Sequence, residues 1–264
     1  RALPGEVQDA MSAPGTNAEI EARARAWRHG THAAVCDVIE PWAHGTVVRA
    51  TRYPSYFDYN LVRVEEDPEM SLEDLVAFAD ETLAGLAHRR FDFDDVAVGD
   101  ALRPGFQAIG WRTARLVWMR HEAPPPPGPD IAVREVPYDA VHALRVAWHG
   151  EDSPDQSAGG YHEQARAVAL SRDVRVLAVH EGDRPIAFAQ LERDGDSAEI
   201  TQVFVHPDHR GAGRGTAMTR AAIQAAGDVR DLWIVADDED RPKELYARLG
   251  FRPVWIAMEA TRWP

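Results

Sequence analysis

The chain has 264 residues, a net charge of −14 and a hydrophobic content of 45%, which is enough to build one large domain or two small ones. The negative charge argues against a nucleic acid partner; it would attract a cationic substrate, although many proteins are acidic simply because charge keeps them dissolved. The single cysteine, Cys36, excludes an internal disulfide framework. No apolar run approaches the roughly 18 residues of a membrane span, and residues 1–30 contain no signal-peptide core. We therefore expect a cytoplasmic protein without a membrane partner.

The first half of the chain predicts a small domain of helices and strands. Residues 1–18 lack hydrophobic periodicity and are interpreted as disordered, and residues 19–122 as the domain. Ser71-Leu-Glu-Asp is typical of a capping box that opens a helix. The predicted elements are helices at 19–28, 71–89 and 105–110 and strands at 46–51, 60–64 and 112–120.

The segment Ala123–Pro129 contains four consecutive prolines, which favour an extended spacer, so residues 123–130 are interpreted as a linker. Residues 131–264 then form a second domain. It is predicted to contain strands at 131–136, 174–180, 185–193, 198–205, 232–236 and 253–261, and helices at 139–148, 161–171, 217–226 and around Tyr246.

A glycine-rich loop follows one of these predicted strands. Residues 203–216 read Val-Phe-Val-His-Pro-Asp-His-Arg-Gly-Ala-Gly-Arg-Gly-Thr. A strand, a glycine loop and a helix start in this order direct several backbone N–H groups at one point and favour a phosphate-bearing ligand. The glycine spacing fits neither a P-loop nor a dinucleotide fingerprint, and an ordinary strand-to-helix turn is the alternative.

The spacing Arg210-x-x-Gly213-x-Gly215 resembles the Arg/Gln-x-x-Gly-x-Gly/Ala loop of the GNAT N-acetyltransferases. A second segment, Leu245-Tyr246-Ala-Arg-Leu-Gly250-Phe251, is similar to the family's Leu-Tyr-x-x-x-Gly-Phe signature, and the two follow in the family's order. The resemblance covers residues 131–264. It implies the GNAT fold, an α+β fold with a mixed, mostly antiparallel sheet flanked by helices, and acetyl-coenzyme A as cosubstrate.

The first half contains a faint echo of the second signature, because Phe106-Gln-Ala-Ile-Gly110-Trp111 also precedes an apolar strand. No glycine loop precedes it. We therefore predict that residues 19–122 form a degenerate GNAT-like domain that does not bind coenzyme A in the usual way. The alternative is an unrelated α+β domain.

The resemblance also implies the residues that bind the cosubstrate. Val203 and Val205 would offer backbone groups to the pantetheine arm, and Arg210 and Arg214 would flank the pyrophosphate unless they are only solvated. The full set of predicted cosubstrate-binding residues is Val203, Phe204, Val205, Arg210, Gly211, Ala212, Gly213, Arg214, Gly215 and Thr216.

Acetyl transfer to an amine needs a base for the ammonium group and an acid for the leaving thiolate. Tyr246 matches the family's tyrosine and is the predicted acid; a packing tyrosine is the alternative. Glu199, eleven residues before Arg210, matches a base glutamate of the histone-acetylating branch and is the predicted base, with a solvated strand-end glutamate as the alternative. Strand alternation places Glu199 on one face with Thr201, Val203 and Val205 unless a bulge intervenes.

Further candidates for the acceptor pocket are His149, Glu151, Asp152, Tyr161 and His162. The sequence departs from the family where an asparagine that often binds the cofactor arm is replaced by Glu239, so that contact is in doubt. No histidine has metal-ligand spacing, and no metal is expected.

The sequence therefore predicts an acetyl-coenzyme A-dependent N-acetyltransferase that acts directly on a primary amine of a small molecule, with a homodimer as a possible assembly. The alternatives are an acetyltransferase of protein N-termini or lysines and a non-catalytic acyl-coenzyme A-binding regulator.

Overall fold

The computed structural model describes residues 16–152 and 160–264. The strands form one 11-stranded sheet in the order β1-β2-β3-β4-β11-β5-β10-β9-β8-β7-β6. They are β1 (Val38–Trp42), β2 (Gly45–Arg49), β3 (Asn60–Val64), β4 (Arg89–Phe93), β5 (Arg112–His121), β6 (Val133–Val136), β7 (Arg175–Glu181), β8 (Arg184–Asp194), β9 (Ser197–Val205), β10 (Asp231–Asp237) and β11 (Phe251–Arg262). The helices are α1 (Asn17–Val35), α2 (Leu72–Thr82), α3 (Val96–Ala108), α4 (His142–Asp152), α5 (Tyr161–Ser171), α6 (Arg214–Ala226) and α7 (Pro242–Arg248), with short 3-10 turns at Phe57–Tyr59, Tyr138–Val141 and Pro207–His209.

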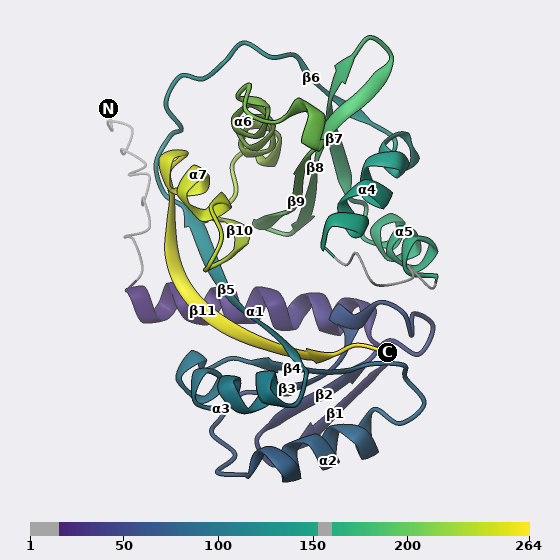
Figure 1. Ribbon diagram of the computed structural model, residues 1–264. Helices are drawn as coiled ribbons and strands as arrows, with labels where there is room; N and C mark the ends of the chain where they lie inside the picture. The colour runs from purple at the N-terminus through teal and green to yellow at the C-terminus, as the bar shows by residue number, and fades with distance from the viewer. Residues whose placement is uncertain (1–15, 153–159) are drawn as a thin grey trace, which may run out of the picture.

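Two long strands are exchanged between the halves of the chain. β5 ends the N-terminal half but pairs with β10 of the C-terminal half, and β11 ends the C-terminal half but pairs with β4. The two exchanged strands also pair with each other, and Figure 1 shows them running side by side from one half of the molecule to the other. The halves therefore share one sheet.

The strands are arranged in the same way on both sides of this central pair. β4, β3, β2 and β1 lie on one side, and β10, β9, β8 and β7 lie at the matching places on the other. Each side contains one parallel pair, β3–β4 and β9–β10, joined by a helix, α2 or α6. A second helix, α3 or α7, then leads into the exchanged strand, so the order strand, helix, parallel strand, helix, strand occurs twice.

Helices cover both faces of the sheet. The side chains of α2 and α3 pack with the N-terminal strands, and α6 and α7 pack with the C-terminal strands. On the other face α1 lies across the junction of the halves, where Trp27 packs with Trp118, Trp233 and Trp255 of the central strands (Figure 1). α4 packs on this face over β7, β8 and β9.

The structure corrects several predicted elements. The helix predicted to reach residue 89 ends at Thr82, since Gly85 adopts a φ of +88°, and β4 follows. Arg90–Phe93 alternates charged and apolar side chains, as a strand does, but the sequence analysis did not predict it. β1 was also missed, and α3 is longer than the predicted 105–110. α1 begins at Asn17 because Thr16 caps it, so the disorder predicted for 1–18 is wrong at residues 17–18; residues 1–15 lie outside the described part.

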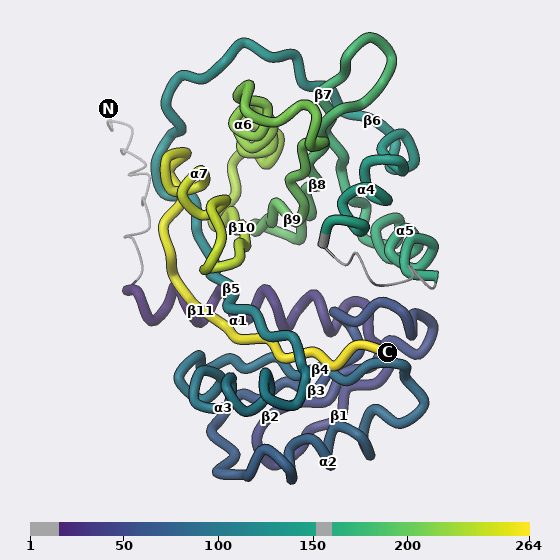
Figure 2. Tube along the Cα trace, viewed as in Figure 1, coloured from purple at the N-terminus to yellow at the C-terminus, as the bar shows by residue number. Residues whose placement is uncertain are grey.

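The proline-rich segment passes over the outside of α6 on its way from β5 to β6 (Figure 2). It touches the predicted phosphate loop: a Cβ on Gly213 would lie 2.9 Å from Cγ of Pro129. Within the described ranges, no helix is long and apolar enough to cross a membrane.

Candidate functional site

The loop between β9 and α6 presents a run of free backbone donors. Gly211 and Gly213 adopt φ values of +81° and +76°, which only glycine adopts without strain. The first helical hydrogen bond of α6 runs from Ala217 N–H to Gly213 O, and no side chain caps the helix. Within the described residues, the N–H groups of 211–216 have no hydrogen-bond acceptor. Consecutive free N–H groups at a helix N-terminus form an anion-binding site.

β9 and β10 run parallel but separate before either strand ends. Their pairing stops at Ile200 and Ile234, whereas β9 continues to Val205. His206 N–H donates to a carbonyl of β8 at 3.0 Å. Because successive residues of a strand direct their backbone groups to opposite edges, Val203 and Val205 direct theirs away from β8, toward the opening beside β10. Apart from the carbonyl oxygen of Val205, which accepts from Arg210, this edge is free and can accept an extended chain as an added strand.

A β-bulge changes the predicted faces of β9. The register with β8 shifts at Thr201, since Gln190 pairs with Gln202 but Leu191 pairs with Ile200. The prediction that Glu199 shares a face with Val203 and Val205 is therefore wrong. The two valines pack with the α6 core, whereas Glu199 faces α1.

Phe204 also points to the α4 side, where it is 4% exposed and packs against Phe188. Its backbone groups face β8, so its predicted cosubstrate contact has no free backbone group beside β10.

The two arginines of the loop already have partners. Arg210 Nη2 donates to a carboxylate oxygen of Glu151 at 2.5 Å, and its Nε donates to the carbonyl oxygen of Val205 at 3.0 Å. Arg214 donates to the carbonyl oxygen of His209 at 2.8 Å. For Arg210 to bind a phosphate group, it must therefore exchange Glu151 for that group.

Tyr246 lies on α7 with 6% of its surface exposed and packs edge-on against Phe251. Burial, together with the nearby carboxylate of Asp240, raises the pKa of the phenol to about 12. Its hydroxyl group makes no hydrogen bond within the described residues. The side chain therefore holds its proton at neutral pH and has a free donor.

Glu199 is held from the other half of the chain. Nε1 of Trp27 on α1 donates to its carboxylate at 2.6 Å. Burial, with Glu192 as the next cause, raises the pKa of Glu199 to about 7. The Trp27 hydrogen bond acts in the opposite direction, because it favours the charged form. A carboxyl group with this pKa gains and loses its proton near neutral pH, as a general base must.

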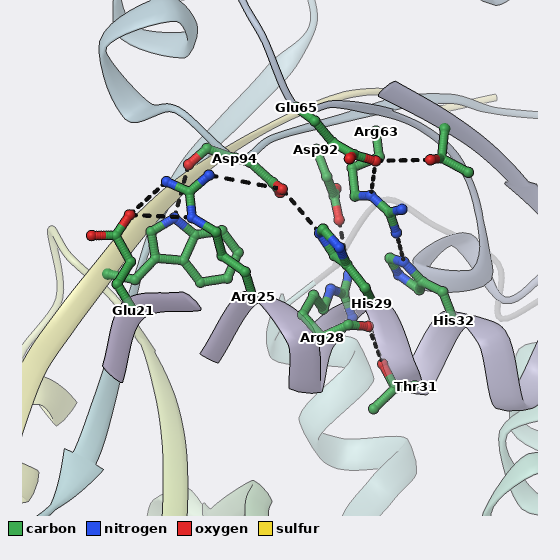
Figure 3. Close-up of polar contacts among 12 residues, drawn as sticks. Glu21, Arg25, Arg28, His29, Thr31, His32, Arg63, Glu65, Asp92 and Asp94 are labelled. Atoms are coloured by element: carbon green, nitrogen blue, oxygen red, sulfur yellow. Dashed lines mark hydrogen bonds and ion pairs between the residues drawn. The ribbon is translucent and has the colours of Figure 1, made fainter. Parts of the chain in front are cut away.

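The matching place in the N-terminal half is closed by charge pairs (Figure 3). The last parallel pair of β3 and β4 is Val64–Phe93, so Arg63 stands where Glu199 stands in β9. Arg63 donates to Glu65 at 2.8 Å and lies 3.1 Å from a ring nitrogen of His32 on α1. Asp94 N–H donates to Val64 O at 2.9 Å as part of this last pair, and β3 ends at Val64, so no strand edge continues beyond the pairing as it does in β9.

A cavity of about 710 Å³ lies between the halves on the α1 face. The turn at 54–58 and the ends of β5 and β11 line it from the N-terminal side, and Trp148, His149 and Tyr161 line it from α4 and α5. Asp237 at the end of β10 also lines it, whereas Glu199, Val203, Val205 and Tyr246 do not. Volumes of this size are typical of small-molecule sites.

Other predicted residues have different surroundings. Glu151 holds Arg210 rather than lining the cavity, the side chain of Asp152 lies outside the described part, and His162 packs against His149 and Tyr161. Glu239 forms a two-pronged ion pair with Arg103 of α3, at 2.7 and 2.8 Å, which directs its charge to the N-terminal half.

The sequence analysis missed every contribution of the N-terminal half, including Trp27 and the turn at 54–58. No local pattern signals them, because 172 positions separate Trp27 from Glu199. Among the described residues, no cluster of three or more His, Cys, Asp or Glu side chains could hold a metal ion.

Comparisons with known proteins agree with this architecture. A family model described as an acetyltransferase (GNAT) domain matches residues 172–253. The mycothiol acetyltransferase of Actinosynnema mirum is 29% identical over 161 residues, which are 54% of this chain and 54% of that protein. The chain thus spans about half the length of this relative.

Two solved structures share the fold over most of both chains. A GCN5-related N-acetyltransferase from Kribbella flavida has a TM-score of 0.55 at 18% identity, covering 94% of this chain and 96% of that one. A functionally unknown conserved protein from Staphylococcus epidermidis has a TM-score of 0.68 at 15% identity, covering 86% and 94%. The predicted α+β fold class is confirmed, and residues 172–253 match the acetyltransferase (GNAT) domain family.

Proposed function

We propose that the protein transfers the acetyl group of acetyl-coenzyme A directly to a primary amine of a small molecule, with both substrates bound together. The observation that carries the proposal is the run of free N–H groups at 211–216, next to the free edge of β9. These groups fit a pyrophosphate and an extended pantetheine arm, respectively.

The loop and β9 bind different parts of the cosubstrate. The loop N–H groups and Arg214 bind phosphate oxygens, and Arg210 joins them after releasing Glu151. Val203 and Val205 bind the pantetheine arm through their backbone, and a free N–H group of β9 polarises the thioester oxygen.

Proton transfer is assigned to two side chains on opposite faces of the sheet. Glu199, with a pKa of about 7, accepts the proton of the acceptor's ammonium group through water, since its side chain does not line the cavity. Tyr246, which is protonated at neutral pH, donates its proton to the leaving thiolate.

The acceptor occupies the cavity between the halves. Its walls come from several elements and its volume is that of a small-molecule site, which favours a small amine over a protein lysine or N-terminus. The name of the A. mirum relative, a mycothiol acetyltransferase, is consistent with a small acceptor.

We further infer that the N-terminal half is a degenerate repeat of the GNAT domain. It repeats the order of elements but has Glu65, Glu66, Asp67 and Glu69 where the second half has the glycine loop. Four carboxylates would repel a pyrophosphate, so this half contributes α1 and the cavity wall rather than a second cosubstrate site.

Calorimetry with acetyl-coenzyme A, coenzyme A and pantetheine tests the cosubstrate site. We expect both coenzyme A species to bind at least about tenfold more tightly than pantetheine, which lacks the phosphates. Replacing Gly213 with Glu should remove that difference, and Gly211→Ala, whose Cβ meets no atom within 4 Å, serves as the control for backbone strain.

Release of free thiol with a panel of amines tests transfer. Acetyl-coenzyme A binding without thiol release for any amine would leave only a non-catalytic binding protein. Equal affinity for coenzyme A and pantetheine would show that the loop does not bind phosphate.

A further inference from the structure

One carboxylate of the cavity, Asp237, stands at the end of β10 beside the opening between β9 and β10. The last parallel pair of these strands is Ile200–Ile234, and Val203 and Asp237 each follow it by three residues. The two residues therefore lie at the same level on either side of the opening, to within about the one residue that the bulge in β9 adds. A thioester bound along the edge of β9 at Val203 would thus have Asp237 across from it.

The side chain of Asp237 lies on the face of the sheet that carries the cavity. Val235, two residues earlier in β10, packs with the tryptophan cluster under α1, and alternation puts Asp237 on the same face. Leu116, the partner of Asp237 in β5, also lines the cavity. Val203, in contrast, packs with the α6 core. An acceptor that enters from the cavity therefore meets Asp237 before it reaches the opening.

The carboxylates that line the cavity differ in their partners. Asp58 and Glu259 both contact the guanidinium group of Arg90, so neither is free to bind a cation of the substrate. Within the described residues, Asp237 forms no ion pair. Its Oδ1 accepts the backbone N–H group of Glu239 at 2.7 Å, and its second carboxylate oxygen has no donor in the same part of the chain.

Both arginines that line the cavity lie at its far end. Arg112 precedes Leu116 by four residues, which is about 13 Å along β5, and its guanidinium carbon lies 5.3 Å from the ring centre of Trp263, beyond the end of β11. Arg90 lies on β4, three strand spacings or about 14 Å from β10. Neither cation therefore neutralises Asp237 by direct contact.

The other cations near the end of β10 are already held by other carboxylates. The ion pairs have N···O distances between 2.5 and 3.4 Å and are Arg103–Glu239, Arg115–Asp100, Arg115–Asp238 and Lys243–Asp238. Arg103 also interacts with the charge of Asp237 at longer range, but Glu239 is the main cause of the raised pKa of its guanidinium group. Asp237 thus presents an ionised oxygen to the cavity that no described cation contacts.

We propose that the acceptor binds as an ammonium ion that pairs with Asp237, and that this side chain therefore selects strongly basic aliphatic amines as substrates. Such amines carry a positive charge at neutral pH, whereas alcohols of the same shape do not. Asp237 holds the amino group on the cavity side of the thioester, and its proton leaves to Glu199 through water. This inference rests on the proposed function, because it describes how the acceptor of that reaction is recognised.

Three amines and their alcohols test the pairing. Benzylamine, cyclohexylmethylamine and octylamine each have an alcohol with the same carbon skeleton and no charge. In calorimetry at neutral pH with the protein saturated with coenzyme A, we expect at least one amine to bind about three- to fivefold more tightly than its alcohol, as for an ion pair that is partly open to water. The difference should decrease with added salt.

Variants of Asp237 locate the charge that causes the difference. Asp237→Asn should remove the preference for the amine and leave the affinity for the alcohol unchanged. The asparagine keeps an oxygen that can accept the N–H group of Glu239, so the local turn is preserved. Asp237→Glu keeps the charge and should retain part of the preference. Glu40→Gln removes an exposed carboxylate outside the cavity and is the control for net charge.

Steady-state kinetics separate binding of the ammonium group from removal of its proton. With the preferred amine, Asp237→Asn should raise KM about three- to fivefold and change kcat by less than about twofold. The acidic limb of the pH profile should stay where it is in the wild type, because Glu199 and not Asp237 accepts the proton. Loss of this limb in Asp237→Asn would make Asp237 the base and overturn its assigned role.

Amines that bind no better than their alcohols, or a preference that persists in Asp237→Asn, would overturn the inference while the proposed transfer reaction stands. The calorimetric comparison needs no turnover. A preference that is lost in Asp237→Asn therefore supports the inference even if no amine is acetylated. If coenzyme A does not bind, the proposed cosubstrate site fails, and the same titrations of the free protein decide on Asp237.

Discussion

The two halves of the sheet share one order of elements, yet they differ where chemistry would take place. The C-terminal half has a glycine loop with free N–H groups, strands that separate beyond Ile200, Glu199 on β9 and Tyr246 before its exchanged strand. The N-terminal half has an acidic loop, a strand β3 that ends at its last pair with β4, and Arg63 and Phe106 at the matching places.

This difference separates what the topology requires from what a reaction requires. Both halves keep a buried aromatic residue four positions before the glycine that precedes the exchanged strand, namely Phe106 before Gly110 and Tyr246 before Gly250. The buried ring is thus common to both halves, and only Tyr246 of the C-terminal half adds a hydroxyl group. Likewise both loops connect a strand to a helix, but in the N-terminal loop Ser71 and Asp67 side chains accept N–H groups that its counterpart leaves free.

Tyr246→Phe gives the C-terminal half the residue type that the N-terminal half has at the matching position, Phe106. We expect turnover to fall by about two to three orders of magnitude, because the leaving thiolate loses its proton donor, while the affinity for acetyl-coenzyme A stays within about twofold. Steady-state kinetics at saturating amine, with calorimetry of the cosubstrate, measure both. Phe106→Tyr is the control and should change neither. Unchanged turnover in Tyr246→Phe would make the hydroxyl group as dispensable as it is in the N-terminal half.

The matched glycines test whether the halves are equally constrained. Gly110 and Gly250 adopt φ values of +82° and +96°, but a Cβ on Gly250 would lie 1.9 Å from the carbonyl oxygen of Ala123, whereas one on Gly110 meets nothing within 4 Å. Gly110→Ala should therefore lower the free energy of unfolding by about 1 kcal/mol and Gly250→Ala by about 3 kcal/mol or more. Urea denaturation measures the difference, and equal losses would contradict the close approach of the linker to α7.

The residue at the Glu199 position decides the expected pH dependence. A base must be deprotonated, so kcat/KM should rise with pH through about 7, the pKa to which burial and Glu192 raise Glu199. Trp27→Phe removes a hydrogen bond that favours the carboxylate, so the pKa should rise and the acidic limb should move up by about one pH unit, with about a tenfold loss below pH 7. Glu199→Gln should abolish the limb. If the acidic limb of the pH profile keeps its position in both variants, it arises from a group other than Glu199.

Local patterns predicted the parts of the site that one stretch of chain builds. The spacing of Arg210, Gly213 and Gly215 placed the loop, and the segment ending in Gly250 placed Tyr246, because glycine conformation and helix termination depend on neighbouring residues. The GNAT fold was predictable for the same reason.

What the sequence could not supply depends on distant partners. The exchanged strands β5 and β11 have the same apolar pattern as any other strand. Their sequences therefore do not indicate that each pairs with the other half of the chain. The bulge at Thr201 inverts the alternation of β9, and the contact between Trp27 and Glu199 arises only because α1 crosses the junction. The cavity needs both halves and therefore has no local signal.

The smallest expected effect concerns Glu151, the carboxylate that pairs with Arg210 beside the proposed phosphate site. Glu151 contacts Arg210 at 2.5 Å. It places one carboxylate beside this loop, where the N-terminal loop has four. Because this pair is exposed, Glu151→Gln should lower the KM for acetyl-coenzyme A only about two- to fivefold and leave kcat unchanged. Arg210→Ala should raise the KM instead, and in that background Glu151→Gln should have no further effect. If the effects of the two substitutions on KM are additive in the double variant, Glu151 acts on the phosphate site through its negative charge and not by pairing with Arg210.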